Sequence, residues 1–232
     1  MKPSVLDQLR EFISTKRELL IVFAGDSHTW GQGADGWSEA LKPGFVAGEW
    51  RRLPESVPCF ARLFHDHLKK LRSAPLETYA INSGYGCAST RIYLENYWLH
   101  AVQAYRPDIV VLEFAINDWI SSNDVSVGDF EKNLNIMISK CCDMGSIPIL
   151  LTVSPINGSQ WSGEHYYQDY INCMLSVAKD RPEAVLADAN GLMSRCLAQL
   201  GSHSSLLFYD DWHVNQKGQE LYCQALAEAI TK

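Results

Sequence analysis

Short apolar runs alternate with longer amphipathic stretches along the chain. Five of the apolar runs have the length of β-strands, and the third and fourth, IVVLEF and IPILLT, are apolar at almost every position, as strands buried on both faces are. We expect strands over residues 19–24, 78–82, 109–114, 147–152 and 185–187. Single strands separated by amphipathic stretches predict a parallel sheet whose strands are joined by crossover helices.

The stretches between these runs carry apolar residues at helical spacing. They predict helices over residues 4–16, 58–71, 90–105, 127–144, 164–179, 190–200 and 216–230. The fold class is therefore α/β, with helices on both sides of a doubly wound sheet of about five strands. No repeat or linker interrupts the 232 residues, so we expect one domain over residues 1–232, in which residues 1–18 lead into the first strand.

Composition and charge narrow the class of substrate. The chain is 47% hydrophobic and 20% charged, which is ordinary for a globular protein with a packed core. Its formal net charge of −7 argues against a surface that follows the phosphates of nucleic acid or an anionic membrane. A small uncharged substrate fits this charge better.

The seven cysteines are odd in number and show neither a CxxC pair nor Cys/His ligand spacing. This pattern favours reduced, mostly buried thiols over a zinc site or a complete disulfide framework. The N-terminal residues lack the apolar run of a signal peptide, and no stretch approaches the roughly 18 apolar residues of a membrane span. We expect a cytoplasmic protein with no membrane span, and the sequence leaves its oligomeric state open.

Ligands of doubly wound sheets collect at the carboxyl ends of the strands, so polar residues there are the first candidates. The first predicted strand runs into Gly25, Asp26 and Ser27, which places a hydroxyl on a tight turn. Ser27 is a candidate nucleophile, although such a serine more often caps a helix. The second strand ends at Asn82 and opens into a turn of small residues through Cys87, whose backbone N–H groups could bind an oxyanion.

Two further groups follow later in the chain. Asn117 comes directly after the third predicted strand and could donate a hydrogen bond from its side-chain amide, or simply stabilise a turn. Asp210 and His213 precede the last amphipathic stretch, where a carboxylate and an imidazole could orient and deprotonate a serine. Taken alone, such a loop pair is more often a solvated surface pair.

The connection over residues 28–58 is unusually long and rich in glycine and tryptophan. Trp30, Trp37 and Trp50 could line an apolar acyl pocket or stack on a sugar ring. They could equally pack this connection onto the domain, and the sequence does not decide between the two.

In their order along the chain, Gly25-Asp26-Ser27, the turn from Asn82 to Cys87, Asn117-Asp118 and Asp210-x-x-His213 resemble the sequence blocks of the SGNH/GDSL hydrolase superfamily. The resemblance spans residues 19–229. It implies a three-layer, flavodoxin-like α/β/α sandwich and a serine hydrolase that needs no metal or organic cofactor.

The resemblance also implies the role of each site residue. Ser27 would be the nucleophile, His213 the general base and then acid, and Asp210 the residue that orients His213. The backbone N–H of Ser27, a backbone N–H from Gly86 or Cys87, and the side-chain amide of Asn117 would form the oxyanion hole.

Three positions depart from the family pattern or need a choice. A gapless match places Cys87 where the family has a glycine that supplies a backbone donor, whereas a shift of one residue selects Gly86. Ala115 replaces the glycine usual before the Asn-Asp pair, a change that the strand end should tolerate. Asp211 is two rather than three residues before His213, so we assign it a surface or capping role.

The resulting hypothesis is an esterase that cleaves short acyl esters, acetyl esters above all, of small molecules or carbohydrates through an acyl-enzyme on Ser27. An acyltransferase would use the same acyl-enzyme and pass the group to an alcohol. A non-catalytic carbohydrate-binding module with the same fold is the remaining alternative. Because one fold supports many functions, the sequence leaves the natural substrate open.

Overall fold

The computed structural model describes residues 3–37, 57–72, 74–120, 125–156, 167–200 and 206–231. Its centre is a five-stranded parallel sheet in the order β2-β1-β3-β4-β5. The strands are β1 (Glu18–Gly25), β2 (Glu77–Gly84), β3 (Ile109–Glu113), β4 (Ile147–Leu151) and β5 (Val185–Ala187). All five predicted strands are confirmed, with ends that differ by at most two residues, and so is the α/β fold class.

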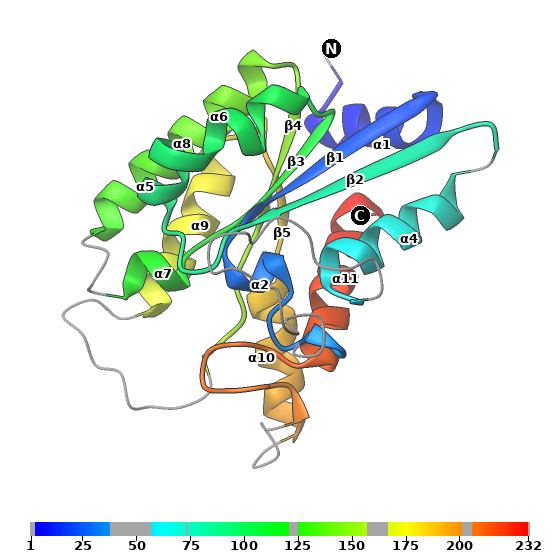
Figure 1. Cartoon of the computed structure of the whole chain (residues 1–232). Helices are drawn as coiled ribbons and strands as arrows, with labels where there is room; N and C mark the ends of the chain where they lie inside the picture. The colour runs from blue at the N-terminus through cyan, green and yellow to red at the C-terminus, as the bar shows by residue number, and fades with distance from the viewer. Residues whose placement is uncertain are drawn as a thin grey trace, which may run out of the picture.

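Helices cover both faces of this sheet (Figure 1). One face carries α1 (Val5–Thr15), α4 (Phe60–Leu71), α10 (Ala189–Leu200) and α11 (Gln216–Thr231). The other face carries α5 (Thr90–Ile92), α6 (Trp98–Ala101), α8 (Val127–Asp143) and α9 (Tyr167–Asp180). Each face buries its own apolar cluster, so the sheet is the middle layer of three.

The prediction of one continuous helix over residues 90–105 is wrong in one respect. It is helical, but it is divided into α5, a π-helical turn η1 (Tyr93–Tyr97), α6 and a 3₁₀ turn η2 (Gln103–Tyr105). Tyr97 stacks on Tyr85 with ring centroids 3.9 Å apart, and the Tyr93 hydroxyl donates to the Ser83 carbonyl at 2.8 Å. These contacts with the end of β2 override the regular helical period.

The carboxyl ends of β1 and β3 continue into two four-residue helices, α2 (Ser27–Trp30) and α7 (Ile116–Trp119), which the hydrophobic pattern did not predict. Gly25 ends β1 and pairs with Gly84 of β2 on one side and Glu113 of β3 on the other. A Cβ on Gly84 would lie 2.2 Å from the Trp30 backbone nitrogen, so the absence of a side chain there lets α2 pack against β2. In Figure 1, α2, α7 and the segment before α11 lie at the same end of the sheet.

Candidate functional site

Ser27 is the first residue of α2, directly after β1. The preceding Asp26 caps this helix, because its carboxylate accepts a hydrogen bond from the His28 N–H at 2.9 Å. Ser27 itself is 8% exposed. The strand and the cap together hold the serine hydroxyl at the carboxyl edge of the sheet.

His213 reaches this edge from a tight loop before α11. Phe208 and Val214 form an antiparallel bridge, and the Tyr209 N–H donates to the His213 carbonyl at 2.8 Å. The Ser27 Oγ lies 2.9 Å from the His213 Nε2. The two predicted residues are thus brought together although 186 positions separate them in the chain.

Asp210 lies on the other side of the same imidazole. Its two carboxylate oxygens are 2.8 and 3.0 Å from the His213 Nδ1, and one of them, Oδ1, also accepts hydrogen bonds from the backbone N–H groups of Trp212 and His213. Burial would raise the pKa of Asp210, but these hydrogen bonds outweigh it and hold the pKa below its ordinary value. Asp210 is therefore an anion at neutral pH. The neighbouring Asp211 is exposed to solvent.

The Asn117 side chain projects from α7 toward the same place. Its amide Nδ2 donates to the Asp26 Oδ2 at 2.7 Å, and the residue is 7% exposed. This contact fixes the plane of the amide beside the residue that precedes Ser27. Ala115, which replaces the family's glycine, has a φ of 166°, an extended value that any residue adopts.

The turn after β2 contains the two candidate backbone donors. The Ala88 N–H donates to the Tyr85 carbonyl at 3.1 Å and closes the turn. Cys87 has a φ of 61°, in the left-handed region that favours glycine, and it is exposed. This conformation agrees with the alignment in which Cys87 stands at the position of the family's glycine.

Three buried carboxyl groups behind Ser27 were not among the predicted site residues: Asp26, Glu113 and Asp118 are 0%, 0% and 1% exposed. Within the described part of the chain, none of them forms an ion pair. The signal for Glu113 was present in the sequence, since a glutamate inside the apolar run IVVLEF is exceptional. Its partners could not be read from the sequence.

Burial sets the ionisation of these groups. It raises the pKa of Asp26 to about 7, although hydrogen bonds from the His28 N–H and the Asn117 amide oppose the shift. It likewise raises the pKa of Asp118 to about 7 against hydrogen bonds from Thr90. For Glu113, burial and then the adjacent charge of Asp26 raise the pKa well above its ordinary value against hydrogen bonds from Thr29 and Asp26, which favours the neutral acid.

A buried histidine lies behind His213. The His28 ring is 5.1 Å from the His213 ring, and its Nδ1 is 3.4 Å from the Tyr222 hydroxyl. Burial and the nearby His213 lower the pKa of His28 well below its ordinary value. His28 is therefore a neutral ring that packs behind the imidazole facing Ser27.

The structure describes two of the three tryptophans of the long connection, Trp30 and Trp37. Trp30 is 2% exposed and packs edge-on against Trp37, with ring centroids 5.4 Å apart. Trp37 in turn packs against the Tyr209 ring, with ring centroids 6.1 Å apart. For these two residues the contacts favour packing onto the domain, and Trp50 lies outside the described residues.

Comparison with known families identifies the chain. The sequence profile of the GDSL-like Lipase/Acylhydrolase family matches residues 23–221. The chain belongs to this family. It is accordingly an ester-cleaving hydrolase, and the match includes Ser27, Asn117, Asp210 and His213. No curated protein sequence matches the chain significantly.

Solved structures share the fold at low sequence identity. LAE5, an α/β hydrolase from the metagenome of Lake Arreo, is 22% identical with a TM-score of 0.70; the alignment covers 94% of this chain and 96% of LAE5. Axe2, an acetylxylan esterase from Geobacillus stearothermophilus, is 20% identical with a TM-score of 0.71, over 95% and 96% of the two chains. Axe2 variants in which an aspartate or a histidine is changed to alanine are described as catalytic mutants of that enzyme.

Other features of the described residues bear on cofactors and thiols. No group of three or more potential metal-ligating side chains occurs among them. All seven cysteines are free, and three of them, Cys59, Cys141 and Cys173, are buried, which is fewer than predicted. None of the described helices is long and apolar enough to span a bilayer.

Proposed function

We propose that this family member is a serine esterase that works through an acyl-enzyme on Ser27, with His213 as general base and Asp210 as the residue that orients it. The observation that carries the proposal is the hydrogen-bonded series from the Asp210 carboxylate through the His213 ring to the Ser27 hydroxyl, at 2.8 and 2.9 Å. An anionic carboxylate at Nδ1 keeps the proton on that nitrogen. The Nε2 lone pair then faces the serine hydroxyl, as a general base requires.

The reaction follows from this arrangement in two stages. The Ser27 Oγ attacks the ester carbonyl carbon while its proton passes to the His213 Nε2, and the carbonyl oxygen becomes an oxyanion. As this intermediate collapses, the bond to the leaving alkoxide breaks and His213 returns the proton to it. A water molecule then attacks the acyl-enzyme, with His213 again taking the proton, and Ser27 is released with the free acid.

The proposed oxyanion hole has three donors: the backbone N–H of Ser27, the backbone N–H of Cys87 and the side-chain amide of Asn117. The backbone of Cys87 has a left-handed conformation, which glycine adopts most easily. This supports matching Cys87, rather than Gly86, to the family's glycine. The hydrogen bond from the Asn117 amide to Asp26 supports a preorganised donor, since the amide does not need to reorient as charge develops.

The proposed substrates are short acyl esters, acetyl esters above all, of carbohydrates or other small molecules. The likeness to an acetylxylan esterase supports this class at the level of fold. The net charge of −7 fits an uncharged ester better than an anionic one.

Hydrolysis of p-nitrophenyl esters of increasing acyl length tests the proposal. We expect the highest kcat/KM for acetate, and loss of activity in Ser27→Ala or after a serine-directed organophosphonate. Folded wild-type protein without activity toward any ester would contradict it. Added alcohol acceptors make the same assay distinguish transfer, because a transferase would convert part of the free acid into a new ester.

A further inference from the structure

A buried polar contact joins the end of β3 to the helix that carries Ser27. The Thr29 hydroxyl donates to the Glu113 Oε2 at 2.7 Å, and both residues are 0% exposed. Thr29 is two residues after Ser27 on α2, and Glu113 is the last residue of β3. Neither side chain has a part in the two stages of hydrolysis above, although burying a glutamate is costly.

The backbone around this contact is closely packed. A Cβ on Gly25 would lie 2.1 Å from the Thr29 Oγ1 and 2.6 Å from the Glu113 carbonyl oxygen. Only glycine lets β1 pass this close to the pair. The contact between Thr29 and Glu113 therefore sets how α2 sits on the edge of β3, and a shift of α2 would carry Ser27 with it.

The two carboxyl groups at this point have different surroundings. Asp26 accepts hydrogen bonds from the His28 N–H and the Asn117 amide, donors that favour a carboxylate. Glu113 accepts a hydrogen bond from the Thr29 hydroxyl, and the backbone N–H groups of Thr29 and Asp26 also lower its pKa, but its Oε1 is buried with no hydrogen-bond partner among the described residues. An ionised Glu113 would face Asp26 with no ion-pair partner in the described part of the chain, so the neutral acid is the form that fits this place.

We propose that Glu113 is a positioning residue for ester hydrolysis: as a neutral acid it anchors α2 through the Thr29 hydroxyl, and so sets the direction of the Ser27 Oγ toward His213. The inference rests on the proposed function, since it assumes that Ser27 is the nucleophile. Glu113 touches no substrate in this account, so its loss should affect turnover rather than binding. A displacement of about 1 Å at a nucleophile can lower the rate roughly 10²-fold, and a partial shift of α2 should cost less.

Two variants of Thr29 that differ by one hydroxyl group test this inference. Thr29→Ser keeps a donor for Glu113, whereas Thr29→Ala removes it, and both side chains are small enough to fit. We expect Thr29→Ala to lower kcat about tenfold with KM nearly unchanged, and Thr29→Ser to retain kcat within about threefold. The rate at which a fluorophosphonate labels Ser27 should fall in parallel, because it reports the reactivity of the serine without substrate binding.

Glu113→Gln examines the ionisation of the acid. The glutamine keeps an oxygen that can accept the Thr29 hydroxyl and carries no charge, so we expect kcat within about threefold of wild type. A loss as large as that of Thr29→Ala would contradict a neutral Glu113.

Ser146→Ala serves as a matched control. The Ser146 hydroxyl is also buried and donates to the Pro107 carbonyl at 2.5 Å, but it lies before β4, at the opposite end of the sheet. It should lower the melting temperature without a change in kcat. Equal kcat in folded Thr29→Ser and Thr29→Ala would overturn the inference, while an inactive wild type or a fully active Ser27→Ala would instead overturn the proposed function.

Discussion

The two ends of the sheet differ in the partners that their buried polar groups have. At the amino end, Arg72 is 6% exposed and its guanidinium donates to four backbone carbonyl groups, those of Phe12, Ile13, Lys16 and Glu77. Lys16 pairs with Asp108 nearby. At the carboxyl end, Asp26, Glu113 and Asp118 are buried without an ion pair among the described residues.

The difference separates polar groups that stabilise the fold from those that shape a site. Arg72 satisfies carbonyls at the end of α1 and the start of β2, which contributes directly to stability. The carboxyl groups near Ser27 cost stability when ionised, and perturbed groups of this kind concentrate at functional sites. Buried carboxyl groups without an ion pair among the described residues thus mark the end of the sheet that carries the proposed site.

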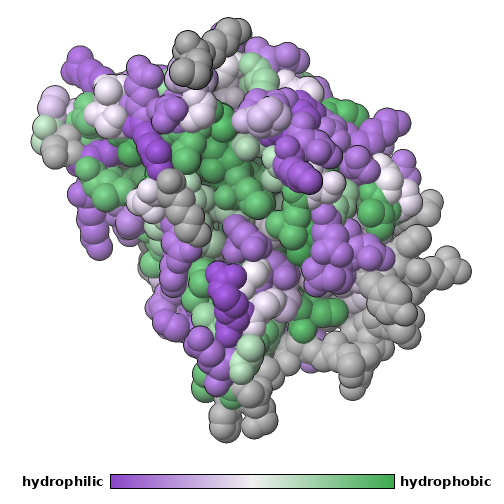
Figure 2. All heavy atoms as spheres, turned by 180° about the vertical axis from the view of Figure 1, so that it is seen from behind, coloured by the Kyte–Doolittle hydropathy of each residue, from purple (hydrophilic) through white to green (hydrophobic). Residues whose placement is uncertain are grey.

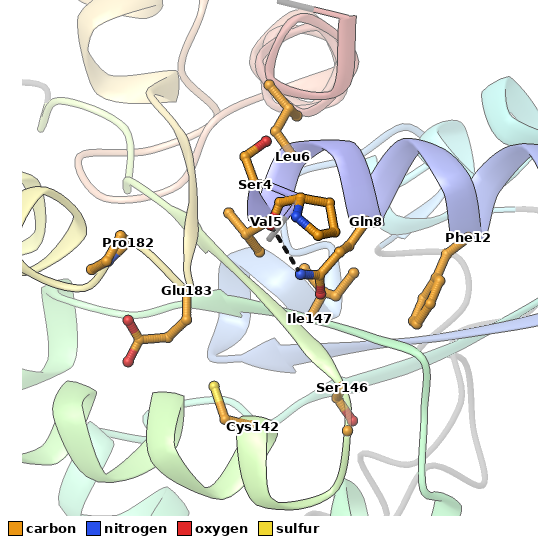
Figure 3. Close-up of a pocket in the computed structure, with 12 residues that line it drawn as sticks. Ser4, Val5, Leu6, Gln8, Phe12, Cys142, Ser146, Ile147, Pro182 and Glu183 are labelled. Atoms are coloured by element: carbon orange, nitrogen blue, oxygen red, sulfur yellow. Dashed lines mark hydrogen bonds between the residues drawn. The ribbon is translucent and has the colours of Figure 1, made fainter. Parts of the chain in front are cut away.

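The proposed site and one hollow of the surface lie at opposite ends of the sheet. A hollow of about 540 Å³ lies at the amino end, between α1 and the segments that precede β4 and β5 (Figure 3). Its lining is mainly apolar, with Val5 and Phe12 on one side and Cys142 and Ile147 on the other. Figure 2, from behind, shows hydrophobic residues gathered in the upper part of this face, with further hydrophobic residues among hydrophilic ones elsewhere. None of Ser27, Asp210 and His213 lines this hollow.

The largest expected effect is at the carboxyl end, on the base. His213→Ala should lower kcat on the order of 10⁴-fold or more, because Ser27 then has no proton acceptor. Steady-state assays with p-nitrophenyl acetate measure the loss, and circular dichroism checks that the fold is retained. Activity within tenfold of wild type would remove His213 from the mechanism.

The next effect is on the proposed oxyanion hole. Asn117→Ala should lower kcat by about 10²–10³-fold with little change in KM, since the lost donor acts on charge that develops only in the transition state. The same assay measures it. A rise in KM at constant kcat would show that Asn117 binds the ground state instead.

At the amino end the expectation is reversed. Arg72→Met should lower the free energy of unfolding by about 2–4 kcal/mol, because it leaves several carbonyls without their donor. Urea unfolding gives this value, and kcat/KM of the folded variant should remain that of wild type. A selective loss of activity in stable Arg72→Met protein would show that Arg72 also acts on the proposed site.

The last expected effect is a pH dependence of stability. The pKa of Asp118 is about 7 in the folded chain and near 3.8 when unfolded, so the folded state binds the extra proton between these values. The stabilising contribution of the protonated acid is complete below pH 3.8 and is lost as pH rises through about 7. The melting temperature of wild type relative to Asp118→Asn should therefore fall from about pH 5 to about pH 8. A constant difference would mean that Asp118 is ionised throughout.

Regular elements and the chemistry-bearing residues could be predicted from the sequence, because each has a local signal. The apolar runs located every strand, and the order of short motifs singled out Ser27, Asn117, Asp210 and His213. The four-residue helices α2 and α7 could not be predicted, since so short a segment shows no helical period. The contacts of Asp26 and Glu113 were equally beyond reach, because they depend on strand register between residues 88 positions apart, Gly25 and Glu113.

In the proposed mechanism Ser27 carries the acyl group. Mass spectrometry of protein quenched during turnover of p-nitrophenyl acetate, followed by peptide mapping, measures this directly. We expect one acetyl group on the peptide that contains Ser27, and none in Ser27→Ala protein. An acetyl group on another residue, such as the exposed Cys87, together with retained turnover in Ser27→Ala, would contradict it.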